Sequence, residues 1–286
     1  MLQEDQDMTQ GKPSTAPHTS RRHPGIWPYL SVWGIALTLA CLGAAPRTAQ
    51  GAALLAEHIE IYASGGVSAS VDLPGCTDTT TGLVDEFDDA GWSETWWSNS
   101  NAFESDFKSS SLVGGDDDNW ADAADFAYFC GHGNTGLVEF TTFTAGDGNR
   151  LLFNNETRFG NFNAEWVTFD TSFTLRDTGS NISTWYSNAF SNLHLLVGWH
   201  DSPLDGDTGG QFADELIDNG IFDGGGNTVQ QAWFSNSGGC TDQNSGTTQS
   251  IIAEIQSHFN DRIWGEGSNA GDQPNNGLGW LSQSDC

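Results

Sequence analysis

The segment Asp125-Phe-Ala-Tyr-Phe-Cys-Gly-His-Gly133 decides the fold of this chain. Its apolar run predicts a buried strand, and the glycines on both sides of His132 predict a sharp turn where that strand ends. In open parallel α/β sheets, ligands and catalytic groups gather at the carboxyl ends of the strands. Because histidine titrates near neutral pH, His132 is a candidate general base, and Gly131 and Gly133 are candidate substrate-binding residues. The alternative is that His132 only marks a turn in a glycine-rich loop.

Other segments extend the pattern to a whole sheet. Apolar runs at 126–131, 166–171 and 193–199 each precede a polar or glycine-rich turn, so we expect three parallel neighbouring strands with their ends along one edge. Residues 58–63 alternate and are expected to form the first strand, and 250–264 has the pattern of an amphipathic helix. Strands alternating with helices predict an α/β fold, a mostly parallel sheet with helices on both faces.

The first 51 residues have the form of an N-terminal tail and a signal peptide. Arg21 and Arg22 precede an apolar stretch at 29–45, which small residues follow. The stretch is short for a membrane-spanning helix, although a retained anchor is the alternative. We therefore expect a secreted, extracellular protein whose residues 52–286 form a single domain with no membrane association after the signal is removed.

The expected mature chain is strongly acidic. Only three of the 38 acidic residues lie before residue 52, and only five basic residues lie after it. Such a surface repels nucleic acid and anionic lipid, so neither is expected as a partner. The acidity fits either a halophile's solvated shell or a protein that binds divalent cations. Asp116, Asp118, Asp205 and Asp207 resemble pieces of calcium-binding loops, with calcium as the candidate cofactor, but solvated acidic loops are the alternative.

Four cysteines lie beyond the leader, and export would permit them to form disulfides. Four cysteines allow three pairings, which the sequence does not resolve. Cys130 lies inside an apolar strand, so a buried free thiol is its expected state. A disulfide is expected among Cys76, Cys240 and Cys286 instead.

An ordered set of segments then carries a family resemblance. They are Trp97 and the stretches 103–107, 124–133, 166–175, 193–198, 210–216 and 228–233. The set resembles an uncharacterised family of bacterial secreted proteins related to the caspase clan of cysteine peptidases, which includes caspases, legumains and gingipains. The resemblance implies a caspase-like three-layer sandwich. It also implies that one strand ends in His-Gly and that the next parallel strand ends in the nucleophilic cysteine.

The sequence departs from that pattern at the nucleophile, because Ser172 occupies the position expected for cysteine. A hydroxyl needs much stronger assistance from a base than a thiol does. One hypothesis is a peptidase or acyl hydrolase acting on a peptide or protein, with His132 as base, Ser172 as nucleophile and Asp170 or Asp201 orienting the base. A second is a catalytically degenerate peptidase fold with a binding or scaffold role, and a third makes Cys130 the reactive thiol.

The fourth strand should end on the same edge of the sheet. His200 and Asp201 follow its apolar run, so His200 is a further candidate for contacting substrate. A metal site built from His132, His200 and an aspartate is an alternative, but the spacing of these ligands is not diagnostic of one.

Overall fold

The computed structural model describes residues 51–62, 71–142, 149–203, 206–217, 226–236, 247–272 and 277–284. The expected signal peptide therefore lies outside the described residues, apart from Gly51. Among the helices that are described, none combines the length and the apolar character needed to cross a bilayer.

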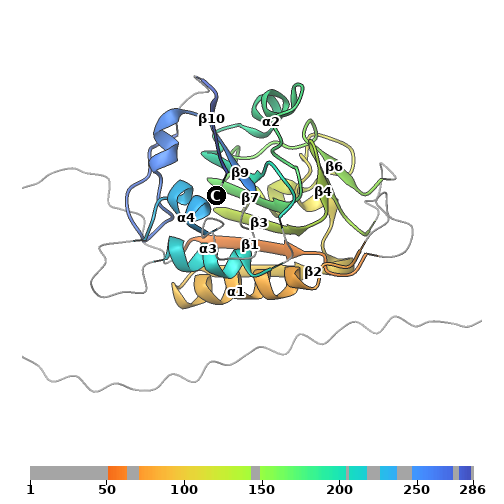
Figure 1. The fold of residues 1–286 in the computed structure, drawn as a ribbon, viewed down its shortest axis with the longest axis horizontal. Helices are drawn as coiled ribbons and strands as arrows, with labels where there is room; N and C mark the ends of the chain where they lie inside the picture. Colours follow the sequence, from red (N-terminus) through yellow and green to blue (C-terminus); the bar gives the residue numbers. More distant parts are fainter. Residues whose placement is uncertain are drawn as a thin grey trace, which may run out of the picture. The chain divides into compact units, whose positions relative to one another are not determined.

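A seven-stranded sheet forms the centre of the domain, in the order β10-β9-β8-β7-β3-β1-β2 (Figure 1). The strands are β1 (Ala53–His58), β2 (Ser93–Ser98), β3 (Phe126–Gly131), β7 (Trp166–Thr171), β8 (Leu195–Trp199), β9 (Thr248–Ala253) and β10 (Gly279–Ser284). Five adjacent strands of the sheet are parallel to one another, in the order β8-β7-β3-β1-β2. β9 is antiparallel to β8, and β10 is antiparallel to β9. The expectation that β3, β7 and β8 are parallel neighbours is confirmed.

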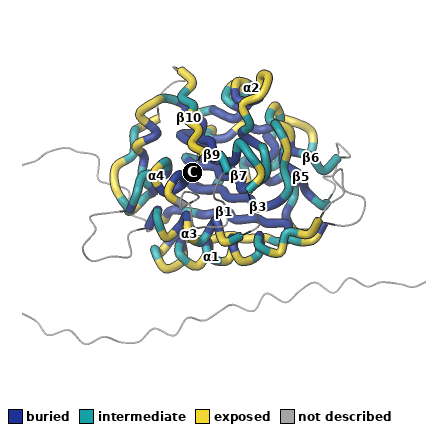
Figure 2. Tube along the Cα trace, in the orientation of Figure 1, coloured by how far each residue is buried: buried dark blue, intermediate teal, exposed yellow. Residues whose placement is uncertain are grey.

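Burial explains why these strands are so apolar. Every residue of β3, β7 and β8 is buried, as the dark blue centre of Figure 2 shows. A strand in the middle of a parallel sheet with both faces covered has no solvent-facing side, so its sequence becomes a continuous apolar run rather than an alternating one. The edge strand β2 is by contrast exposed over nearly its whole length.

Helices cover both faces of the sheet. α1 (Gly75–Asp89), α3 (Thr208–Leu216) and α4 (Val229–Asn236) enclose one hydrophobic core with the sheet, whereas α2 (Asn181–Ala189) encloses the other. Alternate residues of β3 divide between the two cores: Phe126 and Tyr128 face the α1 side, and Phe129 faces the α2 side. The predicted α/β fold with helices on both faces is confirmed.

Smaller elements follow the strands at the edge where His132 lies. β4 (Gly133–Asn134), β5 (Leu137–Glu139) and β6 (Leu151–Phe153) form a separate antiparallel sheet. Four short 3-10 helices, η1 to η4, complete the described structure at Asn99–Asn101, Glu104–Asp106, Asp117–Asn119 and Gln256–Asn260.

Two expected elements were wrong. The first strand is β1 at Ala53–His58, not 58–63, because the buried stretch that pairs with β3 begins before the alternating one. Residues 250–264 do not form a helix, since they divide into the end of β9 and η4. Ile251 and Ile252 are both fully buried because β9 has a core on each face. Together with Phe259 and Ile263, these two apolar residues gave the sequence a spacing like that of an amphipathic helix.

The expectation for the cysteines was also wrong. Cys130 is not a free thiol, because it forms a disulfide with Cys76, with the two Cα atoms 5.5 Å apart. The Cys130 side chain points to the face of β3 that α1 covers, and Cys76 lies in the first turn of that helix. Cys240 and Cys286 lie outside the described residues.

Candidate functional site

The register of the sheet brings the two candidate catalytic residues to one place. Gly131 of β3 pairs with Thr171 of β7, so His132 and Ser172 are each the next residue after a paired position. The carboxyl ends of two parallel neighbours meet at the same edge of the sheet. The common form of the two strands predicted this juxtaposition.

A cavity of about 310 Å³ opens between these strand ends. It is lined by Leu73, Cys76, Cys130, Gly131, His132, Gly133, Asp170, Ser172, Phe173, Ser202, Pro203 and Gly206. Five of the predicted site residues therefore share one cavity: His132, Ser172, Asp170, Gly131 and Gly133. His200 and Asp201 are not among the lining residues, although they follow β8 at the same edge of the sheet.

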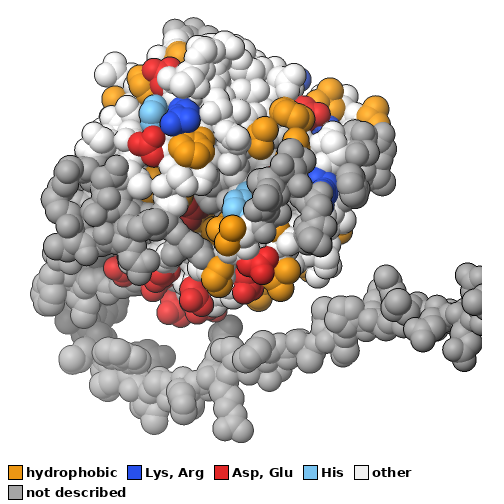
Figure 3. Space-filling view, turned by 45° about the vertical axis from the view of Figure 1, so that its right-hand side comes forward, with side chains coloured by type: hydrophobic (Ala, Val, Ile, Leu, Met, Phe, Trp, Pro, Cys, Tyr) orange, Lys and Arg blue, Asp and Glu red, His pale blue; other side chains and the backbone are white. Residues whose placement is uncertain are grey.

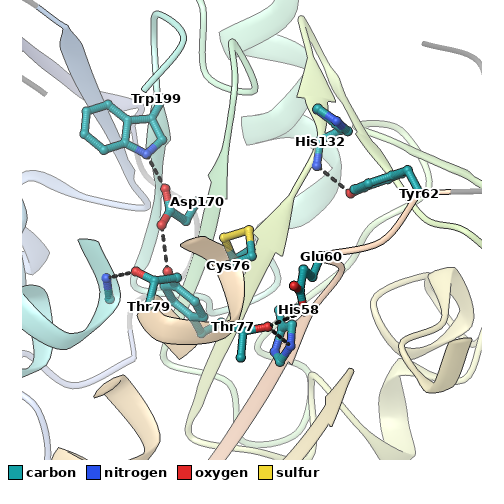
Figure 4. Close-up of a disulfide and its surroundings, with 12 residues drawn as sticks. His58, Glu60, Tyr62, Cys76, Thr77, Thr79, His132, Asp170 and Trp199 are labelled. Atoms are coloured by element: carbon teal, nitrogen blue, oxygen red, sulfur yellow. Dashed lines mark hydrogen bonds between the residues drawn. A yellow bond between two sulfur atoms is a disulfide. The ribbon is translucent and has the colours of Figure 1, made fainter. Parts of the chain in front are cut away.

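Contacts outside the sheet hold His132 in place. Its Nε2 lies 2.7 Å from the carbonyl oxygen of Val71, and the ring of Tyr62 packs against the imidazole at 4.4 Å between centroids. The backbone N–H of His132 donates to the Tyr62 hydroxyl at 2.6 Å (Figure 4). A carbonyl oxygen can only accept, so this arrangement requires the hydrogen on Nε2 and leaves Nδ1 as the ring nitrogen able to accept a proton.

The Ser172 hydroxyl is engaged with a different partner. Its Oγ lies 2.9 Å from the Oγ of Ser202, which comes from the loop after β8. Within the described part of the chain, no hydrogen bond joins Ser172 to His132. The pair thus lines one cavity without the base-to-nucleophile hydrogen bond that activates a serine.

The two candidate orienting carboxylates contact other residues. Asp170 is buried and accepts hydrogen bonds from the Tyr128 hydroxyl at 2.7 Å and from the Trp199 indole N–H at 2.6 Å (Figure 4). Burial, and then the charge of Asp170, raises the pKa of Tyr128 well above its usual value, so this phenol remains a donor. Asp170 thereby joins β7 to β3 and β8.

Asp201 pairs with its own neighbour. Its Oδ1 lies 3.2 Å from Nδ1 of His200, and both side chains are partly exposed. Burial would raise the pKa of Asp201, but hydrogen bonds from Thr248 and His200 lower it overall. His200 and Asp201 therefore form a separate pair beside the cavity.

A further histidine near this edge was not among the predicted site residues. His58 ends β1 and pairs in register with Cys130, and its Nε2 lies 3.2 Å from the hydroxyl of Thr77 in the first turn of α1. That hydroxyl also bonds to a carboxylate oxygen of Glu60 at 2.8 Å (Figure 4). Burial lowers the pKa of His58, although Glu60 opposes the shift. A signal was available, because the apolar run 53–56 ends two residues before His58.

Of the four candidate calcium ligands, the three that the structure describes do not join any group of three or more His, Cys, Asp or Glu side chains close enough to hold an ion. Asp116 accepts from the side chains of Asn119 and Trp120, and Asp118 accepts from the side chain of Asn161 at 3.3 Å. Asp207 caps α3 by accepting the backbone N–H of Gly210. Asp205 lies outside the described residues. For the three that are described, the structure provides hydrogen-bond donors as partners.

Asp122, close in sequence to these aspartates, leads to a prediction about how the stability of the protein depends on pH. The carboxyl group of Asp122 is fully buried and accepts the backbone N–H groups of Gly160 and Phe162 at 2.5 and 3.1 Å. Burial raises its pKa to about 7, despite the bond from Gly160. An unfolded aspartate titrates near 4, so the native state holds this proton more tightly. Stability should fall as pH rises from about 4 to about 7, by at most about 1.4 kcal/mol per pH unit for this one group.

Urea unfolding of the wild type and of Asp122→Asn at intervals between pH 4 and 8 would measure this effect. We expect a shallower fall in the variant, because an amide does not titrate. Some slope should remain, since burial also raises the pKa of Asp117 to about 6 and that of Glu165 to about 7. The exposed Asp89→Asn is the matched control. Equal slopes for Asp122→Asn and the wild type would contradict the prediction.

Residues 56–284 match the family model described as "Domain of unknown function (DUF6345)". No curated protein matches the chain. Among solved structures, one described as pro-sf-caspase-1 has 11% identity and a TM-score of 0.36, covering 67% of this chain and 80% of that chain. A protein of Geobacter sulfurreducens has 13% identity and a TM-score of 0.38, covering 75% of this chain and 98% of that chain.

Proposed function

Because the chain belongs to the DUF6345 family, whose description assigns no activity, we propose a function from the chemistry of the site itself. The cavity at the ends of β3 and β7 binds a segment of a peptide or protein without cleaving it. The observation that carries this proposal is that the two candidate catalytic side chains bond to other residues and not to each other. His132 bonds to the backbone carbonyl of Val71, and Ser172 bonds to Ser202.

Among the described residues that line the cavity, neither serine has a hydrogen bond to a base. A serine needs a base within hydrogen-bond reach, and the base in turn needs a group that orients it. Here Nε2 of His132 donates its hydrogen to the carbonyl oxygen of Val71. Asp170 accepts hydrogen bonds from Tyr128 and Trp199. The nearby sulfur of Cys130 is consumed by the disulfide, which removes the third hypothesis of a reactive thiol at that position.

The same cavity is suited to recognition. Its wall combines apolar groups, such as Leu73 and Phe173, with the hydroxyls of Ser172 and Ser202 and the imidazole of His132. Binding sites commonly pair an apolar lining with a few placed polar groups. The resemblance to caspase-clan peptidases supports a peptide as the ligand class.

The charge of the protein restricts which peptides the cavity is expected to bind. Asp170 contributes a carboxylate to the wall, and the chain carries a formal net charge of -29. On the face shown in Figure 3, Lys and Arg are sparse and acidic side chains gather along one margin. An acidic peptide would be repelled, so neutral and basic peptides are the expected ligands.

Hydrolysis is the second candidate, and one observation favours it. His132 and Ser172 line the same cavity at the ends of neighbouring strands, and catalytic hydrogen bonds are often long or misaligned until substrate binds. In this alternative, His132 would exchange Val71 for Ser172 when a peptide enters.

Export of the protein is part of both proposals. The disulfide between Cys76 and Cys130 supports export, because such bonds persist in an oxidising compartment. N-terminal sequencing of the protein from culture medium tests it.

A binding experiment tests the first proposal. Arrayed peptides of varied charge are probed with the wild type, with Ser172→Phe and with Ser183→Phe, a matched substitution on the exposed face of α2. We expect the wild type and Ser183→Phe to retain a common set of neutral or basic peptides. Ser172→Phe should lose them, because its ring would fill part of the cavity. Equal binding by all three proteins would show that the ligand binds elsewhere.

A hydrolysis experiment separates the two candidates. The same peptides are incubated with the wild type, Ser172→Ala, His132→Ala and Ser172→Cys, and the products are analysed by mass spectrometry. The binding proposal expects no cleavage by the wild type. Cleavage that both alanine variants abolish to the same extent would instead establish a hydrolase, because a nucleophile and its base act as a unit. Cleavage by Ser172→Cys alone would show a peptidase scaffold that lacks only its thiol.

A further inference from the structure

A second group of titratable side chains lies at the opposite edge of the sheet, where the central strands begin. His194 precedes β8, and Glu165 precedes β7. His258 belongs to η4, and Asp261 follows that helix directly. His194, His258 and Asp261 are all buried, with at most 1% of each exposed. Since the cavity lies beyond the other ends of these strands, the group is independent of the function proposed above.

His194 lies between carboxylates on both sides of its ring. Its Nδ1 contacts Oδ2 of Asp261 at 2.6 Å, and its Nε2 lies 3.0 Å from Oε2 of Glu165. Asp272, which is exposed, approaches the same Nε2 at 3.5 Å. Burial alone would lower the pKa of His194, but these carboxylates raise it overall. An excess of carboxylates over cations surrounds one buried ring.

His258 is the residue that this arrangement leaves unexplained. Its ring stacks on that of His194 at 3.8 Å between centroids. It is fully buried, and neither ring nitrogen makes a hydrogen bond of ordinary geometry with any described residue, although the backbone of Gly271 and of His194 lies near enough to affect its pKa. Buried polar atoms without partners are costly and rare in native proteins, so an imidazole in this state needs a further partner.

We propose that His194, His258 and Asp261 form a binding site for one divalent transition-metal ion, with Zn²⁺ as the ion that fits their chemistry best. Each residue offers a ligand atom, and these atoms all lie within 4.8 Å of one another. Two imidazoles and one carboxylate are typical zinc ligands, whereas calcium and magnesium prefer oxygen ligands alone.

The surroundings of two of these ligands support the assignment. Histidine ligands usually direct the second ring nitrogen to a carboxylate or a carbonyl group, and ligating carboxylates are themselves hydrogen-bonded. Here Nε2 of His194, the nitrogen away from the proposed ion, lies 3.0 Å from Oε2 of Glu165, which places a carboxylate at that nitrogen although the two atoms do not form a hydrogen bond of ordinary geometry. The second oxygen of Asp261, Oδ1, accepts the backbone N–H of Ala270 at 2.7 Å.

A metal-free ion pair accounts for only part of the cluster. A protonated His194 pairs with Asp261 and lies beside Glu165 without any metal, although its Nε2 makes no hydrogen bond of ordinary geometry with a described residue. It does nothing for His258, whose stacking on a cation is unfavourable and whose nitrogens stay unpaired. A shared metal gives His258 a partner and replaces the proton between His194 and Asp261 with a larger positive charge. The ion would tie the start of β8 to η4, which is a structural role.

The test uses the full, untagged chain stripped with a strong chelator and then titrated with Zn²⁺ and, separately, with Co²⁺. We expect one equivalent of zinc by mass spectrometry of the metal content, a higher melting temperature with zinc, and a visible absorption band with Co²⁺. His258→Phe should weaken zinc binding by about 100-fold or more. Loss of a residue that only orients a metal ligand lowers the affinity by up to about 100-fold, and loss of a ligand itself should cost at least as much. His200→Gln, outside the cluster, should still bind one equivalent.

The phenylalanine variant also distinguishes the alternatives if it folds well. Removing both unpaired nitrogens with a ring of similar shape should make metal-free His258→Phe at least as stable as the metal-free wild type. Zinc should then raise the melting temperature of the wild type but not of this variant. A folded wild type that takes up no stoichiometric zinc at micromolar concentration, or a His258→Phe variant that binds zinc like the wild type, would overturn the proposal.

Discussion

Replacing both Cys76 and Cys130 with alanine is expected to lower the free energy of unfolding by about 4 kcal/mol. The bond closes a loop with a sequence separation of 54 residues, and cross-linking residues that far apart removes much conformational freedom from the unfolded chain. Both side chains are also buried, so the variant loses some packing between α1 and β3. Urea unfolding of the oxidised wild type and of the double variant measures the difference.

Reduction provides the control for this prediction. A reductant should lower the melting temperature of the wild type by an amount close to the effect of the double substitution. Any effect that remains in the double variant belongs to other cysteines. A double variant as stable as the oxidised wild type would show that the bond contributes nothing, and the position of α1 on the sheet would then rest on apolar contacts alone.

Asp170→Asn is expected to destabilise the protein by about 3 kcal/mol, because it leaves one buried donor facing another. The carboxylate accepts from the Tyr128 hydroxyl and the Trp199 indole on its two oxygens. An amide has only one oxygen, so its NH2 group must point at one of these donors. Since a buried hydrogen bond to a charged group is stronger than a neutral one, the loss exceeds that of an ordinary hydrogen bond.

Asp201→Asn is the matched comparison at the end of the next strand. Asp201 is partly exposed and pairs with His200 across 3.2 Å, so we expect a loss of less than about 1 kcal/mol. Both variants are measured by urea unfolding at pH 7. Similar losses for the two variants would mean that Asp170 does not hold β3, β7 and β8 together as its contacts indicate.

The parallel core of the sheet could be predicted because burial on both faces leaves a clear mark. β3, β7 and β8 are short, mostly apolar runs that end in polar or glycine-rich turns, which is the form typical of strands buried on both faces. β9 carries similar apolar residues but lies where the sheet becomes antiparallel. Its run continues into η4, so burial alone could not distinguish a strand from a helix there.

The candidate site was predictable in position but not in its contacts. Strand ends placed His132 and Ser172 at one edge, and in the register each of them directly follows one residue of the pair Gly131 and Thr171. The partner of His132 is a backbone carbonyl of Val71, which any residue type could supply, so no sequence pattern marks it. The disulfide was missed for a related reason, since pairing Cys130 with Cys76 required knowing which face of β3 the helix α1 covers.

The strand order has a consequence for how the protein is assembled as it is made. β1, β2 and β3 come first in the chain and form one contiguous side of the sheet, and β7, β8, β9 and β10 are then added outward in the order of synthesis. Both cysteines of the Cys76–Cys130 bond belong to this early part. Because the chain is made amino end first, its first helix can be locked onto its first three strands before Ser172 is added, and the remaining strands then dock against an edge that is already covalently fixed.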